Sequence, residues 1–149
     1  MPVEVVRLVN PRALLLEPIQ KLFRDALATA PSFMGSLEEA GAEYAMLLTQ
    51  PRCGVFVGVE KGKYKGLAVV LLPDGKIIPM AQCWVFYSKG TKALKTALIK
   101  AIVDFGLQNG YTKLWAVNGS KVSDAVWSRA FKGAGTLTKV GSIVEFAAG

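Results

Sequence analysis

The predicted fold depends on one stretch of sequence, Ile77-Ile78-Pro79-Met80-Ala81-Gln82-Cys83-Trp84-Val85-Phe86-Tyr87-Ser88-Lys89-Gly90-Thr91-Lys92. Its first ten residues are apolar and typical of a strand, and a short basic loop follows at Tyr87–Lys92. Apolar spacing of three and four then predicts a helix over residues 91–109, and a second apolar strand follows over residues 112–117. The first backbone amides of such a helix have no partners within it, so they and nearby lysines suit a phosphate.

The rest of the chain extends this unit into a mixed sheet. Ser36 and Glu39 have the spacing of a capping box, and Lys61-Gly62 and Asp74-Gly75 are typical hairpin turns. The predicted elements are strands over 3–9, 54–60, 66–72, 77–86, 112–117 and 137–146, and helices over 15–27, 36–51, 91–109 and 120–132. We therefore predict an α/β fold, an α+β mixed sheet of at least six strands in the order β-α-α-β-β-β-α-β-α-β. Its first half is expected to be mostly antiparallel, with a meander of the strands over 54–60, 66–72 and 77–86.

Length and composition favour one domain over residues 1–149, because a chain of this size with 52% hydrophobic residues can bury a sufficient core. The N-terminus does not have the pattern of a signal peptide, and charged residues interrupt every apolar run before it reaches the length of a membrane span. These features predict a cytoplasmic protein. Cys53 and Cys83 stand in apolar surroundings and the chain has no histidine, so we expect buried free thiols and no metal site.

Charge is distributed unevenly along the chain. Residues 1–60 hold five basic and seven acidic side chains, a net charge of −2, whereas residues 61–149 hold thirteen basic and four acidic ones, a net charge of +9. The basic part suits an anionic cofactor, nucleic acid or an acidic protein surface, and the alternative is that its lysines only keep an apolar chain soluble.

The order of elements resembles the GNAT superfamily of acetyl-CoA-dependent N-acetyltransferases over essentially the whole chain. In that family a loop of the form Arg/Gln-x-x-Gly-x-Gly/Ala follows the fourth strand and binds the pyrophosphate of the cofactor. Tyr87, Gly90 and Lys92 stand at these three positions here, so only the glycine agrees. Lys89, Lys92 and Lys95 are either phosphate contacts or a solvated helix end. The cofactor-binding residues that the resemblance implies are Val85, Phe86, Lys89, Gly90, Thr91, Lys92 and Asn118.

The catalytic residues of the family are poorly matched. Asn118 fits the asparagine expected after the fifth strand, but Phe131 stands where a tyrosine would protonate the leaving thiolate. No Asp, Glu or His lies between Lys76 and Val103 to act as a base near the fourth strand. Glu60 and Cys83 are the remaining candidates, as a base and a nucleophile, and each is also explained as an ordinary turn or core residue.

Two functions follow from this resemblance. The leading hypothesis is a GNAT-like protein that has lost catalysis, uses no cofactor and serves in an assembly with other protein subunits. Its size and degenerate loop resemble structural or internal virion proteins of short-tailed bacteriophages, where its basic C-terminal half would face acidic protein or nucleic acid. The alternative is an acetyl-CoA-dependent N-acetyltransferase with an atypical pyrophosphate loop.

Overall fold

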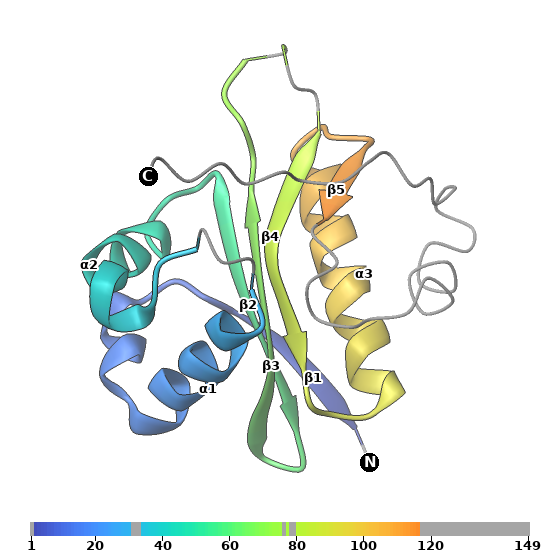
Figure 1. Ribbon diagram of the computed structural model, residues 1–149. Helices are drawn as coiled ribbons and strands as arrows, with labels where there is room; N and C mark the ends of the chain where they lie inside the picture. Colours follow the sequence, from blue (N-terminus) through green and yellow to red (C-terminus); the bar gives the residue numbers. More distant parts are fainter. Residues whose placement is uncertain (1, 31–33, 76, 78–79, 117–149) are drawn as a thin grey trace, which may run out of the picture.

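The computed structural model describes residues 2–30, 34–75, 77 and 80–116, which form a five-stranded mixed sheet with helices on both faces (Figure 1). The strands are β1 (Val3–Leu8), β2 (Cys53–Glu60), β3 (Lys63–Leu71), β4 (Ala81–Ser88) and β5 (Leu114–Ala116). The helices are a 3₁₀ turn at Pro11–Leu15, α1 (Glu17–Ala28), α2 (Leu37–Leu47) and α3 (Lys92–Gln108). The predicted helix over 120–132 and strand over 137–146 lie outside the described residues.

The strands lie in sequence order in the sheet, and only the last pair is parallel. β2, β3 and β4 form the predicted antiparallel meander, β1 pairs antiparallel with β2, and β4 pairs parallel with β5. The turn between β2 and β3 has two residues, Lys61 and Gly62, both with positive φ (54° and 75°), as a tight hairpin requires. This turn places Glu60 at the last paired position of β2, opposite Lys63.

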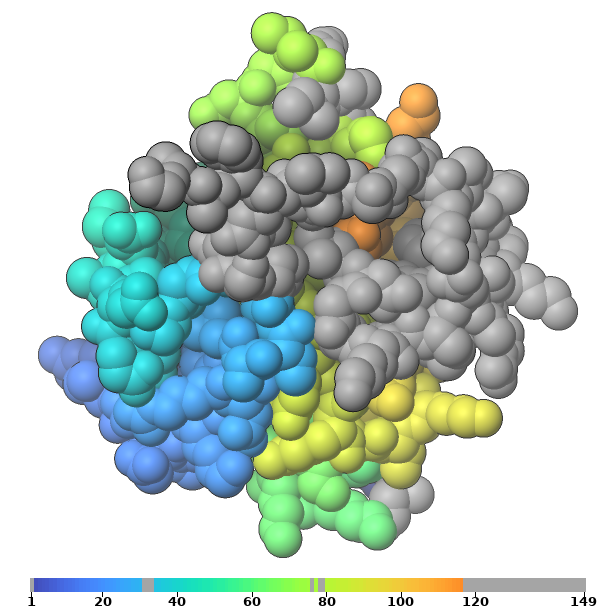
Figure 2. Space-filling view, in the orientation of Figure 1, coloured from blue at the N-terminus to red at the C-terminus, as the bar shows by residue number. Residues whose placement is uncertain are grey.

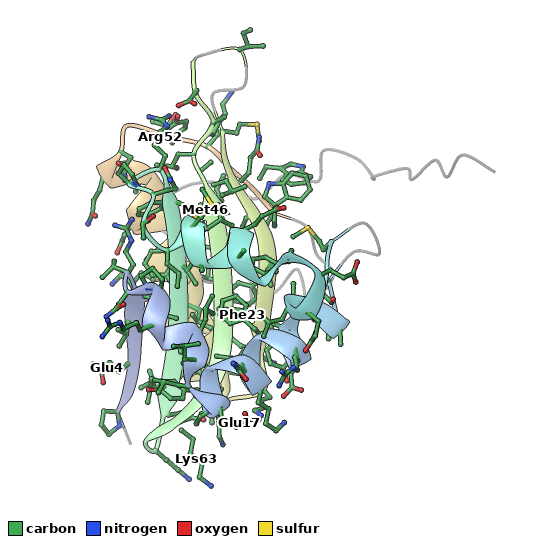
Figure 3. The ribbon with its side chains drawn as sticks, turned by 90° about the vertical axis from the view of Figure 1, so that its left-hand side faces the viewer. Glu4, Glu17, Phe23, Met46, Arg52 and Lys63 are labelled. Carbon is green, nitrogen blue, oxygen red and sulfur yellow. The ribbon has the colours of Figure 1, made fainter. Side chains whose placement is uncertain are left out.

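Two apolar cores lie on opposite faces of the sheet. On one face α1 and α2 cover the sheet, and Phe23 of α1 packs with its ring centroid 5.8 Å from that of Tyr44 (Figure 3). On the other face α3 contributes Leu98, Ile99 and Ile102, which are all fully buried. The three-and-four spacing of the α3 residues explains why a single helix fills this second face.

The fourth strand differs from its prediction. It begins at Ala81 rather than Ile77 and ends at Ser88 rather than Phe86. Ile77 is 97% exposed, so its apolar side chain contributes nothing to the sheet. Tyr87 and Ser88, predicted to belong to the loop, instead pair with Leu67 and Gly66 of β3. Pairing with the neighbouring strand, and not local hydrophobicity, therefore sets the bounds of β4.

A β-bulge interrupts β4 beside its junction with β5. Val69 and Val70 of β3 face Val85 and Cys83, which leaves Trp84 as the extra residue. Val85 and Trp84 pack on the α1 and α2 side of the sheet, whereas Cys83 lies on the α3 side. The pairing of β5 with β4 covers positions 81–83 and 114–116, immediately before this bulge.

The other predicted bounds shift by a few residues. The first helix begins at Glu17, because Leu15 ends a separate 3₁₀ turn and is exposed. The second helix begins after Ser36 as predicted and ends at Leu47, and the third strand begins at Lys63, directly after the tight turn. Both cysteines are buried free thiols, as expected.

Candidate functional site

The candidate site lies where the end of β4, the start of α3 and the β2–β3 turn come together, at the lower end of the molecule in Figure 1. The turn and the start of α3 also lie side by side in the space-filling view of Figure 2. The backbone N–H of Lys89 donates to the carbonyl oxygen of Lys65 at 2.9 Å, which joins the β4–α3 loop to β3. We call Lys89–Thr91, between β4 and α3, the β4–α3 loop.

Glu60 is the polar centre of this site. Its side chain is only 5% exposed, and its carboxylate accepts two hydrogen bonds from Thr91, one from the backbone N–H at 3.3 Å and one from the hydroxyl. We call this pair of hydrogen bonds the Glu60–Thr91 contact. The hydrogen bond from the Thr91 hydroxyl is the main cause that holds the pKa of Glu60 below its ordinary value, and Lys65 and Lys61 lower it further. The carboxylate is therefore ionised at neutral pH.

Thr91 is the N-cap residue of α3, but its side chain does not cap the helix. The hydroxyl is bound to Glu60 and makes no hydrogen bond with an amide of α3. The first backbone hydrogen bond of the helix runs from Lys95 N–H to Thr91 O at 3.1 Å. Within the described part of the chain, the N–H groups of Lys92, Ala93 and Leu94 have no hydrogen-bond acceptor, as the geometry of a helix start implies.

Gly90 lies in close packing within the protein. A Cβ at this position would lie 2.6 Å from Leu94 Cδ2 and 3.2 Å from Glu60 Oε1. Its N–H donates to Ser88 Oγ at 3.2 Å. The glycine lets the loop turn closely over the first turn of α3. Packing within the protein therefore explains a glycine at this position without the close approach of a ligand.

Lysines surround this site on two sides. Lys61, Lys63 and Lys65 come from the β2–β3 hairpin, where Lys63 follows the turn directly (Figure 3), and the loop and α3 add Lys89, Lys92 and Lys95. Lys89 Nζ lies 3.6 Å from Asp25 Oδ2, and this carboxylate also accepts a hydrogen bond from Lys21 at 3.0 Å. The first turn of α3 contains no acidic residue. The resulting field, added to the positive end of the helix, favours an anion.

Cys83 does not have the environment of a nucleophile. The thiol is fully buried on the α3 side of the sheet and donates to the carbonyl oxygen of Val85 at 3.4 Å. Burial raises its pKa to about 12, and burial also raises the pKa of Cys53 to about 11. A thiol with such a pKa is almost entirely protonated at neutral pH, so the structure favours the core interpretation of both cysteines.

The predicted cofactor residues divide into two groups. Lys89, Gly90, Thr91 and Lys92 come together at the start of α3, beside Glu60. Val85 and Phe86 are buried in the two cores on opposite faces of the sheet, so their side chains are unavailable to a ligand. Asn118 and Phe131 lie outside the described residues.

The sequence reasoning missed two contacts, one in the site and one at the β4–β5 junction. The first is the contact between Glu60, the last residue of β2, and Thr91, the residue before α3, which lie 31 positions apart in the sequence. The second is an aromatic pair at the β4–β5 junction, where Trp84 and Trp115 have ring centroids 5.0 Å apart in an edge-on arrangement. Trp84 Nε1 also donates to Gln82 Oε1 at 3.1 Å. The only available signal was an aromatic residue in each of the two predicted strands that flank the helix over 91–109.

Neither a metal site nor a membrane helix is found in the part of the chain that the structure describes. Within residues 2–30, 34–75, 77 and 80–116, no group of three His, Cys, Asp or Glu side chains could hold a metal ion. No helix in these ranges is long and apolar enough to cross a membrane.

Comparisons with known proteins give a structural likeness only. No family model and no curated protein matches the sequence. Among solved structures, AAC(6')-Iy in complex with the bisubstrate analogue CoA-S-monomethyl-acetylneamine aligns at a TM-score of 0.68 and 12% identity, over 99% of each chain. The aminoglycoside acetyltransferase HMB0005 from an uncultured soil metagenomic sample aligns at 0.66 and 15% identity, over 99% of this chain and 100% of that one. The glucosamine-6-phosphate N-acetyltransferase of Arabidopsis thaliana aligns at 0.64 and 13%, over 98% and 99%.

The protein therefore has the fold of the GNAT acetyltransferases over nearly its whole length, as its sequence predicted. The expectation that it uses no cofactor is wrong, because the same fold in AAC(6')-Iy is seen in complex with a CoA-containing analogue. These three structures are acetyltransferases, and none is a virion or assembly protein. The assembly and virion roles stay predictions from the sequence.

Proposed function

We propose that the chain is an acetyl-CoA-dependent N-acetyltransferase, the alternative of the two functions that its sequence suggested. The observation that carries this proposal is the start of α3, where three consecutive backbone amides lie among lysines without an acceptor in the described chain. An anion is the ligand that such a helix start prefers. The acetyltransferase fold makes the phosphates of acetyl-CoA the chemically consistent choice.

The residues present fit these phosphates without the second small residue of the family loop. The amides of Lys92, Ala93 and Leu94 supply donors and the side chain of Lys92 supplies charge, whereas Lys89 would have to share its charge with Asp25. A lysine in place of a small residue occupies more space, but a flexible ammonium also compensates phosphate charge. Val85 and Phe86 take part only through the β4 backbone, because their side chains are core.

Acetyl-CoA supplies an activated acetyl thioester when it is bound. In the transfer, the acceptor nitrogen forms a bond with the acetyl carbonyl carbon, the carbon–sulfur bond breaks, and the nitrogen loses a proton while the thiolate gains one. Glu60 is held by Thr91 on the α3 side of the sheet and Cys83 is protonated in the core, so we assign neither of them a role in proton transfer. Water can protonate a thiolate, and a missing side-chain acid typically lowers the rate by roughly 10²–10⁴-fold without abolishing it.

An assay of acetyl transfer tests this proposal. Purified protein is incubated with acetyl-CoA and a panel of amines that includes aminoglycosides, amino sugars and peptide amines, and released CoA thiol is measured together with the mass of the acetylated product. We expect at least one amine to be acetylated faster than in protein-free controls. If no amine is acetylated and acetyl-CoA does not bind, the proposal is wrong.

A further inference from the structure

Among the described residues, two helix starts follow an N-cap hydroxyl residue, and they differ in how that residue is used. Ser36 caps α2 in the ordinary way, because its Oγ accepts from Glu39 N–H at 3.1 Å. Thr91 has the same extended N-cap backbone (φ −72°, ψ 170°), but its hydroxyl donates to Glu60 and binds no amide of α3. The N-cap side chain of α3 is therefore turned away from its own helix.

The close approach of α3 to β2 keeps the Glu60 carboxylate within hydrogen-bonding distance of Thr91. Two glycines make room for the first turn of α3 to approach β2: a Cβ at Gly58 would lie 2.8 Å from Leu94 Cδ1, and one at Gly90 would lie 2.6 Å from Leu94 Cδ2. At this close approach both oxygens of the buried carboxylate reach Thr91. The contact spans 31 positions of the sequence, so it depends on the whole β2–β3–β4 pairing.

We propose that Glu60 is the positioning residue of the phosphate-binding loop, because it holds the Thr91 hydroxyl away from α3 and so keeps the first amides of the helix available to a ligand. This inference rests on the proposed binding of acetyl-CoA at the same loop. Without Glu60, the Thr91 side chain is free to rotate and accept from Leu94 N–H, which is the ordinary hydrogen bond of an N-cap threonine. The Thr91 hydroxyl then caps α3 and competes with the phosphate for the Leu94 N–H.

The direction of the change in phosphate affinity distinguishes the positioning role of Glu60 from the direct electrostatic effect of its charge. Glu60 is a negative charge next to a proposed anion site, so removing its charge should by itself strengthen the binding of a phosphate. The positioning role predicts the opposite for Glu60→Ala, a weaker affinity. Glu60→Gln removes the charge but keeps a side-chain oxygen that accepts from Thr91, so it should bind at least as tightly as the wild type.

Calorimetric titration of CoA and of pantetheine tests the proposal on wild type and on four variants: Glu60→Ala, Glu60→Gln, Thr91→Ala and the double variant Glu60→Ala, Thr91→Ala. We expect Glu60→Ala to weaken CoA affinity about fivefold, the equilibrium equivalent of a typical N-cap hydrogen bond. We expect the double variant Glu60→Ala, Thr91→Ala to recover most of this loss, because alanine cannot cap the helix. Thr91→Ala alone should stay within about twofold of wild type, and pantetheine, which has no pyrophosphate, should bind wild type and all four variants equally. Glu43→Gln, an exposed change of the same charge on α2, is the control.

The result that overturns the proposal is a double variant that binds CoA no better than Glu60→Ala, since that indicates a general loss of structure. An equal loss of pantetheine affinity would overturn the proposal for the same reason.

Amide hydrogen exchange of the ligand-free protein tests the positioning role of Glu60 without requiring that the protein binds CoA. The Leu94 amide should exchange more slowly in Glu60→Ala than in wild type and in the double variant. If wild type does not bind CoA but this slowing is seen, the proposed function fails and the control of Thr91 by Glu60 stands. If the Leu94 exchange rate is unchanged in Glu60→Ala, the positioning role is wrong.

Discussion

Glu60 shows how much of the site depends on a single side chain. The sequence places this residue before a turn, where a charged side chain is ordinarily solvated, but the structure buries it against Thr91. A buried carboxylate is retained only if hydrogen bonds or charges compensate its lost hydration, and Thr91 with Lys61 and Lys65 supplies both.

The depressed pKa of Glu60 predicts how stability depends on pH. The hydrogen bond from Thr91 lowers the pKa in the folded state below the ordinary value of 4.5, so the unfolded chain binds this proton more readily. The resulting stability is fully present above that ordinary value and is lost as the pH falls through the lowered pKa. Melting temperatures between about pH 7 and about pH 3 should therefore fall more steeply for wild type than for Glu60→Gln. Parallel curves for the two proteins would contradict this account.

Cys83 is expected to be chemically inert in the native protein. Its burial raises the pKa to about 12, and Cys53 is similarly buried, so neither thiol is available as a thiolate. Native protein at about pH 8 should react with iodoacetamide only on the timescale of unfolding, and both thiols should react at once in denaturant. Rapid labelling of Cys83 in the native state, with loss of acetyl transfer, would restore it as a nucleophile candidate.

At the scale of elements, α3 is held to the sheet by one buried face. Leu98 is fully buried, whereas Leu107 on the same helix is 49% exposed. Leu98→Ala should lower the free energy of unfolding by about 2–5 kcal/mol, because it leaves a cavity between α3 and the sheet. Leu107→Ala, the matched control, should change it by about 1 kcal/mol or less. Denaturant unfolding of both variants measures this, and equal losses would show that α3 packs differently.

Elements that depend on local chemistry were predictable from the sequence. The turn at Lys61-Gly62 follows from the need for positive φ, and the start of α2 follows from the pairing of Ser36 with Glu39. The start of β4 was not predictable, because an exposed apolar residue such as Ile77 resembles a strand residue in sequence alone.

The candidate site was predictable only in part, because local sequence does not show which distant residues the strand register brings together. Lys89, Gly90, Thr91 and Lys92 follow one another in the chain, so the loop could be located from sequence. The role of Glu60 could not, because it reaches Thr91 only through the register of three antiparallel strands.

At the scale of the whole molecule, six lysines of the described residues lie on the elements that form the site. The net charge of +9 over residues 61–149 includes the six lysines of the β2–β3 hairpin, the loop and the start of α3. Surface charges are screened over about 8 Å at physiological ionic strength, so their contribution to binding an anion should weaken as salt is added. Pantetheine, which lacks the phosphates, should show no such dependence.

The most direct test of the account is the affinity for acetyl-CoA, measured by calorimetry at low and high salt for wild type, Lys92→Glu and Lys100→Glu. Lys100 is exposed on α3 about 12 Å further along the helix, so its reversal is a control of equal charge. We expect wild type to bind acetyl-CoA, Lys92→Glu to bind at least about tenfold more weakly, and Lys100→Glu to remain close to wild type. Absence of binding by wild type, or equal losses for the two charge reversals, would contradict the claim that the start of α3 is an acetyl-CoA site.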